Sequence, residues 1–218
     1  RQRQMCIRDR VWNEERKKHT KIPVDPHTGN NGKSNDESTW SDYQTALSAI
    51  EKYKCNGLGF YFKKPYFGID IDNIEGEIQR YLQGDIETNM MYEFVTSIKS
   101  YAEYSQSGNG IHIICKGKLP GHRRRKGNVE MYDSGRFFVM TGNTVDRKLN
   151  QVIEPSETTL KLLYNRYIGD DKIIQFNNQN ASESKIDLSE SEIVQKAYES
   201  KQGAKFKVFM EGGCEAFY

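Results

Sequence analysis

Residues 67–72 read Phe-Gly-Ile-Asp-Ile-Asp, and this stretch decides how the surrounding chain is interpreted. Strand side chains alternate between two faces, so Ile69 and Ile71 share one face while Asp70 and Asp72 share the other. The adjacent carboxylates repel each other, and burying them without a counter-charge is costly. A divalent cation such as Mg²⁺ or Mn²⁺ would resolve that conflict. The same pattern also fits a strand that ends in a solvated acidic turn.

Composition sets the limits of the interpretation. The chain has 218 residues, enough for one core of moderate size and an appendage. A net charge of +2 does not by itself mark a nucleic-acid binder. Hydrophobic residues make up 36% and the mean hydropathy is −0.82, which favours a sizeable share of loop or linker.

The cysteines and the apolar runs argue against several classes of protein. The four cysteines are scattered and form no CxxC pair, which disfavours a zinc ribbon and a disulfide framework. No apolar run approaches the roughly 18 residues of a membrane span, and there is no secretory signal. We therefore expect a cytoplasmic protein that does not contact membranes.

The chain divides into four parts by composition. Residues 1–10 are basic and aperiodic, and we interpret them as an artificial leader or assembly scar outside the fold. Residues 11–167 form the predicted main domain. The Asn-, Gln- and Ser-rich residues 168–189 predict a flexible linker, and residues 190–218 predict the start of a truncated helical domain. The absence of a terminating signal at the end suggests a piece of a longer protein.

Periodicity divides the main domain into helices and strands. A turn-rich surface loop covers residues 21–33. One predicted helix is capped by Ser38 or Thr39 and closed by Gly57, with apolar positions Trp40, Tyr43, Leu47 and Ile50. Two further predicted helices cover about 88–100 and 156–166. The predicted strands cover 58–62, 66–72, 101–105, 111–115, 128–132 and 136–141. Short turns join the first two and the last two strands, which predicts two β-hairpins. The fold class is therefore α+β, with a mostly antiparallel central sheet and flanking helices.

A second candidate site element precedes the strand at 111–115. His112 lies between Ile111 and Ile113 and follows the loop Ser107-Gly108-Asn109-Gly110. Backbone N–H groups of a small-residue loop can cradle a phosphate, and His112 can add a hydrogen bond or a positive charge. The alternative is a satisfied core histidine behind an ordinary hairpin turn.

Glu130 is the third candidate. It lies between Val129 and Met131, so its carboxylate points away from their apolar side chains. If its face meets the face of Asp70 and Asp72, three carboxylates converge, enough to hold two cations. Otherwise Glu130 is a routine polar position in a half-exposed strand.

A basic tract separates the histidine strand from the glutamate strand. It runs His-Arg-Arg-Arg-Lys over residues 122–126, with Lys118 nearby. Such a run is often only a solvated loop, but between two site strands it favours polyanion binding. Arg136 begins the next strand and can reach a phosphate as a planar fork.

These motifs and their order resemble the archaeo-eukaryotic primase superfamily. The motifs are Gly-Ile-Asp-Ile-Asp (68–72), Ser-Gly-Asn-Gly-Ile-His (107–112) and Val-Glu-Met-Tyr-Asp-Ser-Gly-Arg-Phe-Phe-Val-Met-Thr-Gly (129–142). The chain is most similar to the primase–polymerases of phages and plasmids, including the deep-sea vent phage type of DNA polymerase. The segments 21–26, 57–60 and 203–212 also match that group, so the resemblance covers about residues 11 to 218. It implies an RRM-like catalytic core.

The resemblance implies a role for each candidate residue. Asp70, Asp72 and Glu130 correspond to ligands of two Mg²⁺ or Mn²⁺ ions, with Glu130 where many members have Asp. Ser107, Gly108 and His112 correspond to the triphosphate site, with the longer serine–histidine spacing usual for the phage branch. Arg136 and Phe137 correspond to nucleotide contacts, and Phe in place of Tyr leaves sugar discrimination open. Template or phosphate contacts are expected from Lys21, Arg123, Arg124, Arg125 and Lys126.

The activity that this resemblance implies is template-dependent nucleotidyl transfer on single-stranded DNA by a two-metal mechanism. The chain would act as a DNA primase, a DNA polymerase or both in phage or plasmid replication, in the cytoplasm of a bacterial host. The expected partners are a single-stranded template, a primer and dNTPs or NTPs. A helicase is expected after Tyr218.

Three rival functions use parts of the same pattern. A metal-dependent nuclease or phosphodiesterase would use the same carboxylates, with His112 as the available base. A nicking replication initiator normally needs a close His-hydrophobe-His pair, which the four histidines do not form. A non-catalytic single-strand-binding module would use Tyr101, Tyr104 and Tyr132 as stacking platforms.

Overall fold

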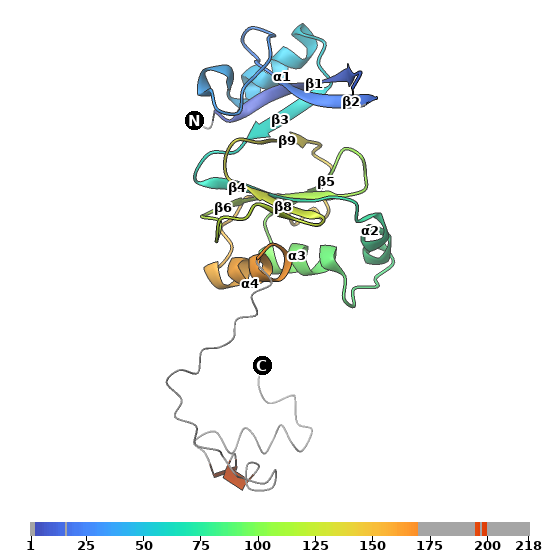
Figure 1. Ribbon diagram of the computed structural model, residues 1–218, viewed down its shortest axis with the longest axis vertical. Helices are drawn as coiled ribbons and strands as arrows, with labels where there is room; N and C mark the ends of the chain where they lie inside the picture. The colour runs from blue at the N-terminus through green and yellow to red at the C-terminus, as the bar shows by residue number, and fades with distance from the viewer. Residues whose placement is uncertain (1–2, 16, 170–194, 197, 200–218) are drawn as a thin grey trace. The chain divides into compact units, whose positions relative to one another are not determined.

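The structure is a computed structural model that describes residues 3–15, 17–169, 195–196 and 198–199. The chain forms two compact units, residues 1–171 and 172–218. Nearly all of the second unit lies outside the described residues, and so do the predicted linker from residue 170 on and most of the predicted helical domain. The first unit is described below (Figure 1).

The first unit contains two antiparallel sheets. The four-stranded sheet has the order β2-β1-β3-β9, formed by β1 (Met5–Asn13), β2 (Lys18–Val24), β3 (Gly57–Tyr61) and β9 (Phe137–Met140). The five-stranded sheet has the order β5-β6-β4-β8-β7, formed by β4 (Tyr66–Ile71), β5 (Tyr101–Tyr104), β6 (Ile111–Lys116), β7 (Arg125–Lys126) and β8 (Val129–Tyr132). The predicted α+β class with antiparallel sheets is confirmed.

Four α-helices accompany the sheets: α1 (Tyr43–Lys52), α2 (Glu75–Leu82), α3 (Met90–Ile98) and α4 (Glu157–Tyr167). A 3₁₀-helix, η1 (Glu37–Thr39), precedes α1. The side chain of Asn89 caps α3 by accepting a hydrogen bond from the Tyr92 N–H. The predicted apolar stripe of α3 is confirmed, because Met91, Phe94, Val95 and Ile98 are all buried. No helix in the described residues is long and apolar enough to cross a membrane.

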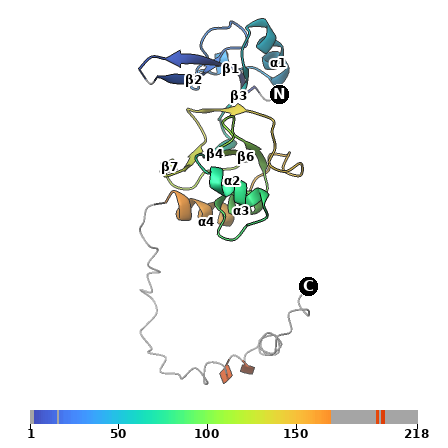
Figure 2. The same cartoon turned by 90° about the vertical axis from the view of Figure 1, so that its right-hand side faces the viewer.

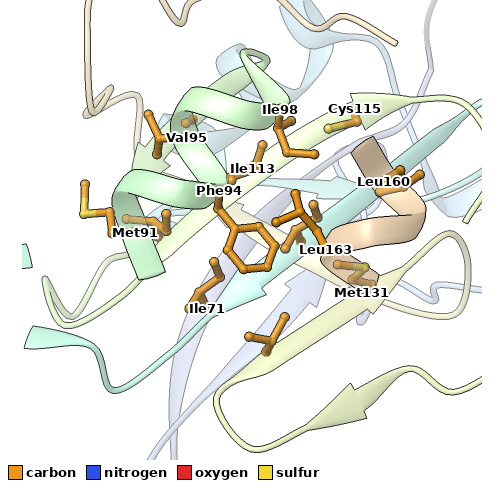
Figure 3. Packing of buried hydrophobic residues seen from close by; sticks show 14 of the residues in the cluster. Ile71, Met91, Phe94, Val95, Ile98, Ile113, Cys115, Met131, Leu160 and Leu163 are labelled. Carbon is orange, nitrogen blue, oxygen red and sulfur yellow. The ribbon is translucent and has the colours of Figure 1, made fainter. Parts of the chain in front are cut away.

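One face of the five-stranded sheet, here called the helix face, packs on α3 and α4 (Figures 1 and 2). Alternate strand residues supply it: Ile71 from β4, Ile113 from β6 and Met131 from β8 are fully buried. They meet Phe94 and Leu163 of the helices (Figure 3). Each such side chain stabilises the fold by about 1.5–3 kcal/mol relative to an exposed one.

The opposite face, here called the charged face, is partly covered by the four-stranded sheet. Phe62 and Phe138 lie against it at Gly68 of β4. A Cβ atom at Gly68 would be 2.3 Å from Cζ of Phe62 and 2.5 Å from Cε2 of Phe138. Only glycine therefore lets these aromatic rings approach the strand so closely, two residues before Asp70.

Both predicted hairpins are wrong. β3 pairs with β1 and β9, whereas β4 pairs with β6 and β8, so the turn between β3 and β4 carries the chain from one sheet to the other. The turn between β8 and β9 does the same. Alternation shows which faces of a strand are buried, but it does not identify the strand that pairs with it.

The exclusion of residues 1–10 from the fold is also wrong. β1 begins at Met5, and its first residues pair in register with β3, with Cys6 opposite Gly59. Met5, Cys6 and Ile7 are buried. Part of the predicted loop 21–33 is strand as well, because Lys18–Val24 form β2. Both segments are therefore strands of the four-stranded sheet, although their composition predicted a leader and a loop.

The first predicted helix is shorter than expected, and its apolar stripe is different. It begins after Asp42, whose carboxylate accepts a hydrogen bond from the Thr45 N–H. Ala46 and Ala49 are its buried residues, whereas Tyr43 and Leu47 are exposed. The short helix α2 was not predicted. Ile78 is its single buried residue, so α2 has no apolar stripe from which periodicity could predict a helix.

Candidate active site

A row of ionisable side chains crosses the charged face, one from each strand of the five-stranded sheet. Strand register places Glu103 opposite His112, His112 opposite Asp70, Asp70 opposite Glu130, and Glu130 opposite Arg125. Residues directly opposite each other on neighbouring strands share a face and lie close together. The structure therefore brings together Asp70, His112 and Glu130, which sequence motifs far apart in the chain had singled out.

Asp70 is a mostly buried carboxylate of this row, and one of its oxygens has no hydrogen-bond partner. Its side chain is 20% exposed, and its Oδ1 atom is buried without a hydrogen-bond partner. Burial, reinforced by the negative charges of Asp72 and Glu130, raises the pKa of Asp70 to about 6, although His112 acts in the opposite direction. His112 Nε2 lies 3.7 Å from Oδ1, too far for a hydrogen bond, and a divalent cation would supply a closer counter-charge.

Asp72 lies one residue beyond the end of β4 and is exposed. Its backbone N–H donates to the carbonyl of Asn128, next to β8. Gly110 packs directly against it, because a Cβ atom there would be 2.4 Å from the Ile71 carbonyl oxygen and 3.0 Å from Oδ1 of Asp72. The loop of the second motif and Asp72 of the first motif are thus in contact.

His112 is buried between two carboxylates. Its Nε2 lies 3.7 Å from Oδ1 of Asp70, and its Nδ1 lies 3.4 Å from Oε1 of Glu103. The ring also lies against Phe138 of β9, with ring centroids 4.9 Å apart. The four-stranded sheet therefore forms one wall of the histidine's environment.

Glu103 is the member of the row that sequence reasoning missed. It is 0% exposed, and its carboxylate accepts hydrogen bonds from the Tyr101 hydroxyl and from the backbone N–H groups of Thr141 and Gly142. Burial by itself would raise the pKa of Glu103, but these bonds and the one with His112 together lower it. The available signal was a charged residue between Ala102 and Tyr104 in a short strand, the same signal that marked Glu130.

The carboxylate of Glu130 is engaged by two neighbours. Arg125 Nε lies 2.9 Å from Oε1, and the Tyr132 hydroxyl donates to Oε2 over 2.8 Å. In the described part of the chain, no three His, Cys, Asp or Glu side chains lie close enough to share a metal ion. Both Glu130 oxygens have partners, so this carboxylate would have to give up those contacts in order to bind a cation together with Asp70.

The loop between β5 and β6 is a tight turn at the edge of the site. Ser105 N–H donates to the Gly110 carbonyl, and Gly108 has a φ of +80°, a conformation that favours glycine. Ser107 is exposed, and its hydroxyl lies 3.1 Å from that of Ser105. Gly108 has open space around it. Ser107 and Gly108 are therefore accessible to a ligand, in the loop whose Gly110 packs on Asp72.

The two candidate nucleotide contacts at the start of β9 are placed differently. Arg136 is exposed and lies over the ring of Tyr132, 5.0 Å from its centroid, close to Glu130. Phe137 instead packs against Tyr61, away from the charged face. The structure does not bring Phe137 to the row. The ring that contacts His112 is that of Phe138.

The basic tract borders the row at the β7 edge of the sheet. Arg125 reaches Glu130, Arg124 lies 3.9 Å from Asp133, and Arg123 donates to the Arg125 carbonyl. Lys21 on β2 is close enough for its charge to lower the pKa of Asp70, against the larger effect of burial. The positive residues therefore lie on two sides of the carboxylates.

The residues present suit a hard divalent cation. Asp70, Asp72 and Glu130 offer carboxylate oxygens, which Mg²⁺ and Mn²⁺ prefer, and one buried oxygen of Asp70 has no hydrogen-bond partner. No thiolate ligand lies in the row, and His112 is its one nitrogen ligand. Cys6 and Cys115 are buried elsewhere, and burial raises the pKa of both to about 12.

Fold and site together define an α+β protein with a carboxylate–histidine row on one face of an antiparallel sheet. No family model matches the chain. Its sequence is similar to the DNA primase-polymerase of Nitratiruptor phage NrS-1, with 35% identity over 144 residues. The match covers 62% of this chain and 19% of the phage protein, so the chain corresponds to less than a fifth of that relative. The resemblance to phage primase–polymerases is confirmed.

Proposed function

We propose that this chain carries the nucleotidyl-transfer centre of a phage-type DNA primase–polymerase and extends a nucleic-acid strand on a single-stranded DNA template. The row of Asp70, His112 and Glu130 on one sheet face carries this proposal. The name of the phage relative supports the same class of reaction. A nucleotidyl transfer needs acidic metal ligands, a triphosphate site and a positively charged path for the strands, and residues of each kind lie together here.

Asp70, Asp72 and Glu130 are the proposed ligands of two Mg²⁺ or Mn²⁺ ions. When bound, such ions lower the pKa of the attacking 3′-hydroxyl and neutralise the triphosphate and the leaving pyrophosphate. The protein's part is to present these carboxylates on one rigid face, with Asp70 fixed in the centre of the sheet. No side chain is required as a covalent nucleophile.

The triphosphate of the incoming nucleotide would lie along the β5–β6 loop. Ser107 and Gly108 are exposed there, and the Nε2 atom of His112 faces Asp70. Arg136 is exposed over the ring of Tyr132, whose hydroxyl donates to Glu130, and it offers a planar, permanently charged fork. These groups would hold the phosphates in line for attack, which is the main contribution that positioning makes to phosphoryl transfer.

The basic residues supply the proposed contacts with the nucleic-acid backbone. Arg125 and Lys126 form the edge strand next to Glu130, and Lys21 approaches from the four-stranded sheet. Cationic side chains neutralise strand phosphates without reading their sequence. This arrangement suits a template and primer that pass over the charged face.

A primer-extension assay tests the proposal. Purified protein receives a labelled primer on a single-stranded template, dNTPs or rNTPs, and Mg²⁺ or Mn²⁺. We expect template-dependent extension by the wild type and a loss of about a hundredfold to a thousandfold for Asp70→Asn, as removal of a central electrostatic group typically causes. Asp85→Asn is the matched control, because Asp85 is exposed and pairs with Arg80 outside the row.

Two results would contradict the proposal. Metal-dependent shortening of the labelled strand would indicate a nuclease that uses the same carboxylates. Binding of single-stranded DNA that is equal in the wild type and in Asp70→Asn, without any extension, would indicate a non-catalytic binding module.

A further inference from the structure

The far ends of β1 and β2 project from the four-stranded sheet (Figure 2). β1 pairs with β3 only from Met5 to Arg8, whereas its pairing with β2 continues to Asn13. Residues 9–22 therefore form a ribbon of two strands, here called the β1–β2 arm. The proposed site assigns a task to only one residue of this arm, Lys21.

One face of the β1–β2 arm combines aromatic and positively charged side chains. Strand register places Trp12 opposite His19, and Arg10 opposite Lys21. Residues two positions apart on a strand share a face, so both pairs lie on the same face of the arm. Trp12 is 47% exposed, and the other three residues are exposed as well. A ligand can therefore reach all four side chains.

Trp12 differs from Trp40, the other tryptophan of the chain. Trp40 is 6% exposed, its indole N–H donates to the Lys33 carbonyl, and its ring stacks on Tyr61. Trp12 contacts His19 edge-to-face, with ring centroids 5.3 Å apart, and almost half of its surface stays open. A single exposed apolar residue is common, so the argument rests on the charges that accompany this ring.

The spacing of the two pairs suits a nucleic-acid strand. Two residues along a strand rise about 7 Å, so the Arg10–Lys21 pair lies one such step from the Trp12–His19 pair. A base that stacks on Trp12 would then have a neighbouring phosphate within reach of these cations. Aromatic platforms flanked by positive charge are typical of sites that bind single strands without reading their sequence.

The cationic pair lies on the side of the arm that leads to the candidate active site. Burial raises the pKa of Asp70, and the charge of Lys21 is among those that lower it, so Lys21 lies near the charged face. Trp12 lies further out on the same face of the arm. A strand bound along the arm would therefore continue toward the carboxylates.

We propose that the β1–β2 arm binds single-stranded DNA outside the catalytic row, with a base stacked on Trp12 and the adjacent phosphates neutralised by Arg10 and Lys21. The identification of this DNA as the template rests on the proposed function. The binding itself does not require catalysis.

A purely structural role for Trp12 is the competing explanation. Its cross-strand pair with His19 also stabilises the arm. If that were its whole role, Trp12→Ala would loosen the arm and weaken the binding of any polyanion to the same extent. The experiment must therefore separate stacking on a base from attraction to phosphates.

Two labelled probes make this separation. One is an oligothymidylate of about 16 nucleotides, and the other is a strand of the same length and charge that consists of abasic sites. Their affinities for the full chain are measured by fluorescence anisotropy in chelator and without nucleotide, so that no reaction occurs. We expect the wild type to prefer the oligothymidylate.

Trp12→Ala should lower the affinity for the oligothymidylate about fivefold to 150-fold, the loss typical of one stacked base. Its affinity for the abasic strand should change by less than about twofold. Lys21→Ala should instead weaken both probes alike and reduce the slope of log affinity against log salt by about 1.

Tryptophan fluorescence gives a second measurement that does not depend on how a variant folds. Trp40 is buried, so a base that stacks on the protein can quench only Trp12. We expect the oligothymidylate to quench the wild type and the abasic strand to leave its emission almost unchanged. Trp12→Ala should lose this quenching.

Tyr43→Ala is the matched control. Tyr43 is 51% exposed, and it lies at the opposite end of β1, where Met5 forms a bridge with Ser41. It should keep the affinity for both probes within about twofold. Equal losses in Tyr43→Ala and Trp12→Ala would overturn the proposal.

Two further results would overturn it: an unquenched wild type at saturating oligothymidylate, or a Trp12→Ala variant that loses affinity for both probes equally. In primer extension, Trp12→Ala should raise KM for the template and keep kcat within about twofold. A wild type that is quenched by the oligothymidylate but never extends a primer would contradict the proposed function and leave the DNA-binding arm in place.

Discussion

The two faces of the five-stranded sheet are built from the same strands but serve opposite purposes. On the helix face, Ile69, Ile71 and Ile113 are 0% exposed and pack on α3 and α4. On the charged face, Asp70 and His112 occupy the alternate positions of the same strands. Because strand side chains alternate, a strong apolar face can hold a destabilising row of charges in place. Residues that stabilise the fold and residues of the candidate site therefore alternate along the same strands.

The largest expected effect comes from breaking the helix face. Phe94→Ala removes a fully buried ring from the cluster in Figure 3 and should lower the free energy of unfolding by about 3–5 kcal/mol. Urea denaturation followed by circular dichroism measures this. Leu162→Ala, at an exposed position of α4, is the control and should change stability by less than about 0.5 kcal/mol. Equal losses of stability in Phe94→Ala and Leu162→Ala would mean that packing on the helix face does not stabilise the sheet that carries the site.

Neutralising Asp70 on the charged face should raise the free energy of unfolding, whereas Phe94→Ala lowers it. The pKa of Asp70 is raised to about 6, so the folded state binds its proton more tightly than the unfolded state does. The wild type without metal should therefore lose stability relative to Asp70→Asn as pH rises from about 4 to about 6. Above that range the variant should be more stable by about 1–3 kcal/mol.

Thermal unfolding of both proteins in chelator, at several pH values, measures this difference. Added Mg²⁺ or Mn²⁺ should stabilise the wild type and leave Asp70→Asn almost unchanged, because binding to the folded state alone raises stability. A difference in stability between the two proteins that does not change with pH would contradict the raised pKa of Asp70.

Gly110→Ala tests how closely the β5–β6 loop fits the charged face. The new Cβ would meet the Ile71 carbonyl oxygen at 2.4 Å, so the loop must move away from Asp72. We expect a loss of about 1–3 kcal/mol and a marked loss of primer extension. Gly76→Ala on α2 is the control, because it has open space and should stabilise by up to about 1 kcal/mol. An active, fully stable Gly110→Ala would separate this loop from the site.

The smallest expected effect on stability comes from Arg125→Ala at the edge of the row. Arg125 itself is exposed and its partner Glu130 is half-buried, so stability should change by less than about 1 kcal/mol. Affinity for single-stranded DNA should fall, and the slope of log affinity against log salt should decrease by about 1. Arg166→Ala is the matched control, because Arg166 pairs with Glu93 at a similar exposure on α4. Equal losses of DNA affinity would mean that the β7 edge is not the binding path.

The comparison also explains which sequence predictions succeeded. The helix-face strands and the stripe of α3 follow from periodicity, because burial on one side of an element is a local property. The motif residues Asp70, His112 and Glu130 were found for the same reason, since each interrupts an apolar alternation. Their role as metal or nucleotide ligands stays a prediction.

The failures involve partners that are distant in the chain. Two short turns looked like hairpins, but β3 and β4 lie in different sheets, as do β8 and β9. Residues 1–10 lack periodicity, yet Met5–Asn13 pair with two strands. Phe137 was predicted as a nucleotide contact, but Phe138 is the ring that lies against His112, because the sheet that positions both residues was not predicted. Pairing depends on the whole assembly of strands, which no local pattern records.

By itself, the sequence determined which residues of each strand share a face, because the alternation of side chains is fixed by backbone geometry. The tertiary structure alone decided that the faces bearing Asp70, His112 and Glu130 are the same face of one sheet. It also decided that Glu103 completes the row. The physical reason is that strand order and register are set by the packing of the two sheets and four helices together, at Gly68 and Phe138 among other contacts.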